Sequence, residues 1–175
     1  LRYLLTVPVS RTRLLAVKFA SLCAGAFWGV LTVAIPGAII GIALFGFGPM
    51  PTLSGSTLSA GEAVGRLVLV CLYLTAGLSA LAAVGLFIST LTEQPIGASV
   101  AVMIVTIVSW ILVGVPQLSW LHPWLLVDHW MAFQEFLRDP IAWDAPLAGL
   151  RLFALYAVVF WTLAWARFSG KDVTS

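Results

Sequence analysis

Four long apolar runs, separated by short polar segments, form the dominant pattern of the chain. They cover approximately residues 19–47, 66–91, 96–115 and 147–168. Each run is long enough to cross a bilayer as a helix, which requires about 20 mostly apolar residues. A helix of a soluble bundle would carry a polar stripe toward water, whereas these runs are apolar on all sides. The pattern predicts an all-α, polytopic membrane protein with four transmembrane helices.

Polar residues between the runs mark where the helices should begin. Ser59 and Glu62 follow a segment rich in Gly, Pro and Ser, and their spacing is typical of a capping box. Arg66 lies four residues after Glu62, so we expect their side chains to pair. Pro95 follows a short polar turn and suits the first position of a helix, and Asp144 is expected to start the last helix.

The segment 116–146, between the third and fourth runs, contains four tryptophans, which prefer the headgroup layer of a bilayer. Apolar residues within it fall on one face of a helix, at Leu126, Trp130, Phe133 and Leu137. This spacing predicts an amphipathic helix that lies in the outer interface. Two roles stay open for it, a gate over a substrate path and an interfacial anchor.

Small residues in the first run recur at a spacing of four. Gly25 and Gly29 form one pair, and Gly37 and Gly41 form another. Such pairs let two helix backbones approach closely within a membrane. We therefore expect these glycines to lie on a helix-packing face, with Pro36 between the two pairs as a bend.

Composition agrees with a membrane protein and narrows the chemistry. The chain is 61% hydrophobic and 9% charged, whereas soluble domains are about 25% charged. A net charge of +2 with no basic stripe gives no indication of nucleic-acid binding. Cys23 and Cys71 fall inside apolar runs, which favours two core thiols over a disulfide. The spacing of His122, Asp128 and His129 matches no usual ligand pattern, so no metal site is expected.

The distribution of Lys and Arg predicts the orientation of the chain. Six basic residues flank the runs on the side of both termini, and three lie on the other side. The first group consists of Arg2, Arg11, Arg13, Lys18, Arg167 and Lys171, and the second of Arg66, Arg138 and Arg151. The positive-inside rule then places segment 1–18 and tail 169–175 in the cytoplasm. Arg13, Lys18, Arg167 and Lys171 are expected to anchor the chain at the inner membrane surface.

Ionisable residues are missing from most of the apolar sequence. Residues 19–61, 67–92 and 94–127 contain no Asp, Glu, Lys, Arg or His apart from His122. Transporters driven by protons or sodium place such groups within the membrane. The chain also lacks the Gly-rich phosphate loop of ATP-hydrolysing proteins. We therefore expect any uphill transport to draw its energy from a partner protein.

The stretch LRYLLTVPVSRTRLLAVKFASL resembles the cytoplasmic loop and following helix of bacterial type-2 ATP-binding-cassette exporter permeases. The matching positions are Pro8, Val9, Ser10, Arg11 and Lys18. The turn GLFISTLTEQPIGA is similar to the short cytosolic hairpin of that family, and FWTLAWARFSGKDVTS to its closing span and tail. The resemblance extends over nearly all 175 residues and forms a pattern of order rather than a fingerprint.

The resemblance implies a permease of six spans with an interfacial or re-entrant helix before the last. Since four spans and no initiator Met are present, an amino-terminal truncation is expected. It further implies a bacterial inner-membrane location and a second permease in a homodimer or heterodimer. A separate cytosolic ATPase would hold ATP and Mg²⁺, and the chain itself would bind no cofactor. The cargo implied is hydrophobic or amphipathic.

The first residues are the expected point of contact with the ATPase. An amphipathic turn at the start of the chain would fit a groove on the partner, Pro8 would end it, and Ser10 would cap the next helix. The residues expected to couple are Leu1, Arg2, Tyr3, Leu4, Leu5, Pro8, Val9, Ser10 and Arg11. The alternative function is a membrane assembly or anchoring protein that transports nothing. An intramembrane enzyme is disfavoured because no nucleophile and base pair is visible.

Overall fold

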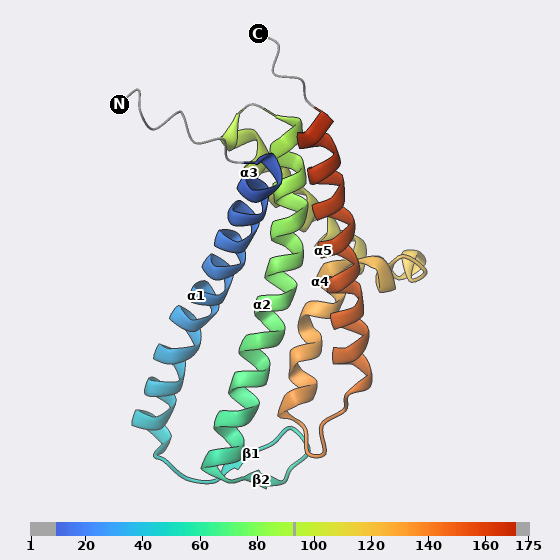
Figure 1. The fold of residues 1–175 in the computed structure, drawn as a ribbon. Coiled ribbons are helices and arrows are strands. Elements are labelled where there is room, and N and C mark those ends of the chain that lie inside the picture. Colours follow the sequence, from blue (N-terminus) through green and yellow to red (C-terminus); the bar gives the residue numbers. More distant parts are fainter. Residues whose placement is uncertain (1–9, 93, 171–175) are drawn as a thin grey trace, which may run out of the picture.

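A computed structural model describes residues 10–92 and 94–170 of the chain (Figure 1). Its four long helices are α1 (Arg11–Phe45), α2 (Ala60–Leu91), α3 (Pro95–Val113) and α5 (Asp144–Gly170). All four are long and apolar enough to cross a membrane. The predicted all-α fold with four such helices is therefore confirmed, and it is compatible with a multi-pass membrane protein.

The helix α2 lies at the centre of the bundle. It packs most extensively against α5, and α1 and α3 also pack against it. Helix α1 begins and α5 ends at the same end of the bundle, which we call the terminal end (Figure 1). The opposite end carries a two-stranded antiparallel hairpin of β1 (Met50–Pro51) and β2 (Thr57–Leu58), and we call it the hairpin end.

The predicted helix starts agree with the structure. The side chain of Ser10 accepts a hydrogen bond of 3.4 Å from the backbone N–H of Arg13 and caps α1. Ser59 and Glu62 form both halves of a capping box at the start of α2. Pro95 is the first residue of α3, where its missing N–H costs no helical hydrogen bond.

The hairpin between α1 and α2 is an element that the loop-like composition did not predict. Gly46 and Gly55 have φ angles of 81° and 84°, a region that glycine enters without steric penalty. Around Gly55, the side chain of Thr52 accepts a hydrogen bond from the backbone N–H of Ser56. The hairpin therefore reverses the chain, and α2 starts at the end of the bundle where α1 stops (Figure 1).

The third crossing of the bundle is broken into pieces. With 19 residues, α3 is about 29 Å long, whereas the 32 residues of α2 extend about 48 Å. The chain then passes through short elements that return it to the hairpin end (Figure 1). They are η2 (Pro116–Leu118), η3 (His122–Trp124), α4 (Leu126–Trp130) and η4 (Met131–Leu137), of which the η elements are 3₁₀ helices.

The main apolar core lies where α2, α5, α4 and η4 meet. Its buried members are Tyr73, Ala80, Val84, Leu126, Phe136 and Phe153. By contrast, the surfaces of α1 and α3 are largely exposed, and they are apolar, as Val33 at 76% and Ile96 at 78% exposure illustrate. Exposed apolar surface on this scale suits contact with lipid or with another membrane protein.

Candidate functional site

At the terminal end, the first turns of α1 are attached to the last turns of α2 and α5. Leu15, Leu86 and Ala164 form a second buried cluster that joins one residue from each helix. Above it, the indole Nε1 of Trp165 donates a hydrogen bond of 3.0 Å to the hydroxyl oxygen of Thr12. A displacement of the start of α1 would therefore be transmitted to both neighbouring helices.

Most residues of the expected coupling segment lie outside the described part of the chain. These are Leu1, Arg2, Tyr3, Leu4, Leu5, Pro8 and Val9, together with Lys171 of the tail. Ser10 caps α1 as expected, and Arg11 is the first residue of that helix. Docking on an ATPase stays a prediction for all of them.

The basic residues expected at the inner surface gather at one end of the molecule. Arg13 and Lys18 belong to the first turns of α1, and Arg167 to the last turn of α5. All three side chains are exposed. Since α1 begins where α5 ends, these cations lie on helix turns of the terminal end, as an anchor at one membrane surface requires.

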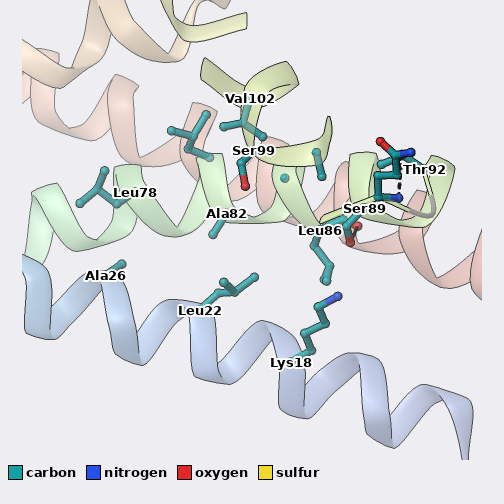
Figure 2. A pocket seen from close by; sticks show the side chains of 14 residues that line it. Lys18, Leu22, Ala26, Leu78, Ala82, Leu86, Ser89, Thr92, Ser99 and Val102 are labelled. Carbon is teal, nitrogen blue, oxygen red and sulfur yellow. Dashed lines mark hydrogen bonds between the residues drawn. The ribbon is translucent and has the colours of Figure 1, made fainter. Parts of the chain in front are cut away.

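A cavity of about 730 Å³ opens at this end between α1, α2 and α3 (Figure 2). We call it the terminal cavity. Lys18, Leu22 and Ala26 line it from α1, and Ser89 of α2 and Thr92, which directly follows α2, belong to the opposite wall. The wall on α3 and on the turn before it is made by Gln94, Ala98, Ser99 and Val102.

The terminal cavity is polar at one end and apolar at the other. Figure 2 shows Lys18, Ser89 and Thr92 together near the last turns of α2, while Ala26 and Leu78 lie at the far side. The hydroxyl of Ser89 donates to the backbone carbonyl of Leu86 at 2.7 Å, so its oxygen keeps acceptor capacity toward the cavity. This arrangement suits an amphipathic guest better than a uniformly polar one.

The glycine pairs of α1 do not pack against another helix of this chain. A Cβ atom built on Gly25, Gly29, Gly37 or Gly41 would have no described atom within 4 Å outside the local helix. Within the described part of the chain, the expected close helix contact is therefore absent. Gly37 and Gly41 instead line a groove of about 440 Å³ between α1 and α2 near the hairpin end.

Close backbone approaches occur at three other glycines, which the sequence did not single out. A Cβ on Gly77 would lie 3.2 Å from ring atoms of Phe153 and Trp130, and one on Gly85 would lie 3.2 Å from Val102. At Gly149 a Cβ would collide with the hydroxyl of Tyr73. These glycines do not recur at the four-residue spacing that marks a packing face, so no local signal identified them.

The expected amphipathic helix of segment 116–146 is divided between α4 and η4, and its apolar side faces protein. Leu126 is buried, and Trp130 and Phe133 pack against the main core, while Leu137 is 37% exposed. The apolar spacing therefore predicted that one face of this segment is buried, but it did not predict that this face packs against protein rather than in the membrane interface. The indole N–H of Trp130 is buried and has no hydrogen-bond partner among the described residues.

Two tyrosines attach this segment to the middle of the bundle. Tyr73 of α2 donates a hydrogen bond of 2.7 Å to the backbone carbonyl of His129, and Tyr156 of α5 donates one of 2.7 Å to that of Trp124. Tyr73 lies near the middle of α2, and Tyr156 near the middle of α5. The chain thus leaves α3 partway along the bundle, and α4 and η4 re-enter between α2 and α5.

Arg66 fastens the other end of η4 and does not form the expected pair with Glu62. Its Nη1 atom donates to the backbone carbonyls of Phe136 and Arg138, each at 3.1 Å. Its Nη2 atom lies 3.7 Å from the Oδ1 atom of Asp139. The carboxylate of Glu62 instead accepts hydrogen bonds from the N–H and the hydroxyl of Ser59.

Residues with metal-binding chemistry are dispersed. The Nε2 atoms of His122 and His129 each lie 3.2 Å from a backbone carbonyl oxygen. Cys71 is buried and Cys23 is half-buried, and both are free thiols. Over residues 10–92 and 94–170, no three His, Cys, Asp or Glu side chains converge to hold a metal ion.

Comparison with known proteins places the chain in a family without assigning it a function. No curated protein and no solved structure matches it. One family model, described as "Protein of unknown function (DUF2705)", matches residues 1–174. Since the match extends over almost the whole sequence, the chain belongs to this DUF2705 family of unknown function.

Proposed function

We propose that the chain is the membrane-spanning permease subunit of an ATP-binding-cassette exporter in the bacterial inner membrane, with both of its ends in the cytoplasm. A separate cytosolic ATPase would hydrolyse ATP with Mg²⁺, and a second permease, identical or different, would complete the transporter. The exported substrate is hydrophobic or amphipathic. The chain's own role is to convert movement of the ATPase into movement of helices.

The observation that carries this proposal is the lack of ionisable side chains along three helices. Beyond Lys18 in α1, beyond Arg66 in α2 and throughout α3, the sequence contains no Asp, Glu, Lys, Arg or His. An ion-driven transporter needs such groups at membrane depth to bind its coupling ion. These three helices therefore offer no ionisable group to a coupling ion, which supports an energy source outside the membrane. Contrary to the expectation from sequence, Asp128 and His129 of α4 lie at the level of Tyr73 in the bundle.

The terminal end supplies a physical route for that energy. The segment before Ser10 leads directly into α1, whose first turns are joined to α5 by the Trp165–Thr12 hydrogen bond. The cluster of Leu15, Leu86 and Ala164 adds buried packing between α1, α2 and α5. Close-packed interiors transmit displacement rather than absorb it. A displacement of the first residues would therefore be transmitted to α2 and α5.

The proposal can be tested by co-purification. The chain is co-expressed with the product of any neighbouring reading frame that encodes a phosphate loop, and complex formation is compared for Pro8→Ala, Arg11→Glu and the hairpin-end control Arg138→Glu. We expect the first two changes to abolish the complex while the chain still inserts, and the control to retain it. An intact complex and unchanged transport in all three would contradict the proposal. Stable insertion with neither ATPase nor transport would favour an assembly or anchoring role.

A further inference from the structure

We infer that the terminal cavity is a binding site for one anionic phospholipid of the adjacent leaflet, with the headgroup phosphate at Lys18 and an acyl chain between α1 and α3. This inference requires the helices to cross a bilayer and does not depend on the proposed transport role. Three features of the cavity support it: its charge, its apolar depth and its exposure.

The charge of the cavity selects an anion. Of the described residues that line it, Lys18 alone carries a formal charge. The two ion pairs recorded in the described part of the chain are Arg66 with Asp139 and Arg138 with Glu135, so Lys18 has no carboxylate partner there. A lysine ammonium near a membrane surface attracts phosphate, so Lys18 is the group of the cavity that would hold a headgroup phosphate.

The depth of the cavity selects an apolar chain attached to that anion. Lys18 and Ala26 are eight residues apart on one helix, which corresponds to about 12 Å along its axis. Over this length the wall is formed mainly by Leu22, Leu78, Ala82 and Val102. A volume of about 730 Å³ falls within the range of ligand sites. A free phosphate ion would occupy only the polar mouth and leave this apolar surface uncovered.

The exposed side chains in the wall of the terminal cavity indicate from which side a ligand enters. Lys18 is exposed, and Leu22 is 40% exposed although it lines the cavity. A site open along an apolar helix surface is reached from the surrounding acyl chains without passing through water. Phospholipid is the anionic amphiphile present at that position, with its phosphate already at the level of the helix ends.

Lipid binding is measured on the full chain in mixed vesicles with spin-labelled phosphatidylglycerol and, as the zwitterionic reference, spin-labelled phosphatidylcholine. The electron spin resonance spectrum gives the fraction of each lipid held immobile by the protein. We expect a preference for phosphatidylglycerol that Lys18→Gln lowers about fivefold. Lys18→Arg should retain the preference, and Arg13→Gln, which removes a terminal-end cation that does not line the cavity, should leave it unchanged.

Two further arms separate the possible occupants. Ala26→Phe, which fills the apolar part of the cavity from α1, should abolish the preference for phosphatidylglycerol, and inorganic phosphate should not reduce this preference in the unmodified chain. The inference would be overturned by an unchanged preference in Lys18→Gln or by an equal loss in Arg13→Gln. Loss of the preference on addition of inorganic phosphate, or an unchanged preference in Ala26→Phe, would overturn it too. So would disulfide cross-linking between two copies of a Leu22→Cys variant, made in a chain with Cys23 and Cys71 replaced by Ala, in the same vesicles.

Discussion

The hydroxyl of Tyr73 donates a hydrogen bond of 2.7 Å to the backbone carbonyl of His129, which ties the middle of α2 to α4. The same ring contacts Phe136 and Phe153 at centroid distances of 5.6 and 5.3 Å. Tyr73 thus contacts α4, η4 and α5. These contacts hold the short elements that follow α3 against α2.

Replacement of this tyrosine tests the attachment. Tyr73→Phe keeps the ring and removes one hydrogen bond to the partly buried carbonyl of His129, so we expect the free energy of unfolding to fall by about 1 kcal/mol. An SDS titration of the purified chain measures this loss. Tyr156→Phe removes a comparable bond at a more exposed position and should cost less. A larger loss in Tyr156→Phe than in Tyr73→Phe would count against this account.

Glycine substitutions give a second test. The four-residue spacing predicted close helix contacts at Gly37 and Gly41, whereas the structure has a close contact at Gly149. Gly149→Ala places a methyl group against the hydroxyl of Tyr73 and should destabilise the chain by about 1–3 kcal/mol in the same titration. Gly37→Ala and Gly41→Ala, which meet open space, should be neutral or stabilising by up to about 1 kcal/mol. Strong destabilisation at Gly37 in the isolated chain would show a helix contact that this arrangement lacks.

Local signals predicted the helices well. The apolar runs identified all four long helices to within a few residues, except that α1 and α2 begin earlier than their apolar runs, and the capping residues Ser10 and Ser59 marked those starts. The capping residues predict helix starts well because a cap depends only on residues within one turn of each other. The same locality explains why the α3 start at Pro95 was predicted to the residue.

Long-range partners were not predictable in this way. Arg66 has an acid four residues before it, yet its guanidinium binds carbonyls 70 and 72 residues away. Likewise, an apolar stripe looks the same whether it meets lipid or protein, so the spacing of Leu126 and Trp130 did not reveal that they pack into the core. Small-residue spacing shows where a helix permits close approach, and the structure shows that α1 makes no such approach within the described chain.

Arg66 offers a third prediction. Arg66→Gln removes the guanidinium that holds the carbonyls of Phe136 and Arg138, so the end of η4 should open more often. Hydrogen exchange can detect this at the amide of Leu53, which donates to the carbonyl of Leu137 at 3.1 Å. We expect its exchange to rise about tenfold, the factor that corresponds to about 1.4 kcal/mol of opening free energy.

The control for Arg66 is Arg138→Gln. That change removes an exposed ion pair with Glu135 three residues away, a kind of pair that contributes about 0–1 kcal/mol. The Leu53 amide should then exchange almost as in the unmodified chain. Equal acceleration by both variants would mean that general charge at the hairpin end, rather than the hydrogen bonds of Arg66, protects this segment.

The last prediction concerns the link between α1 and α5. Because Trp165 donates to the hydroxyl of Thr12, Thr12→Val and Trp165→Phe should each weaken the terminal end, and the double variant should cost less than the sum of the two. Since the bond is exposed, a coupling energy of about 0.5–1 kcal/mol is expected. Thr32→Val, which removes a hydroxyl bonded only within α1, serves as the control and should show no coupling to Trp165→Phe.

If the proposed function holds, Thr12→Val and Trp165→Phe should also lower transport per ATP hydrolysed without releasing the ATPase, because the connection that carries movement from α1 to α5 is weakened. Purely additive losses in stability, together with unchanged transport per ATP, would show that this contact carries no movement between the two helices.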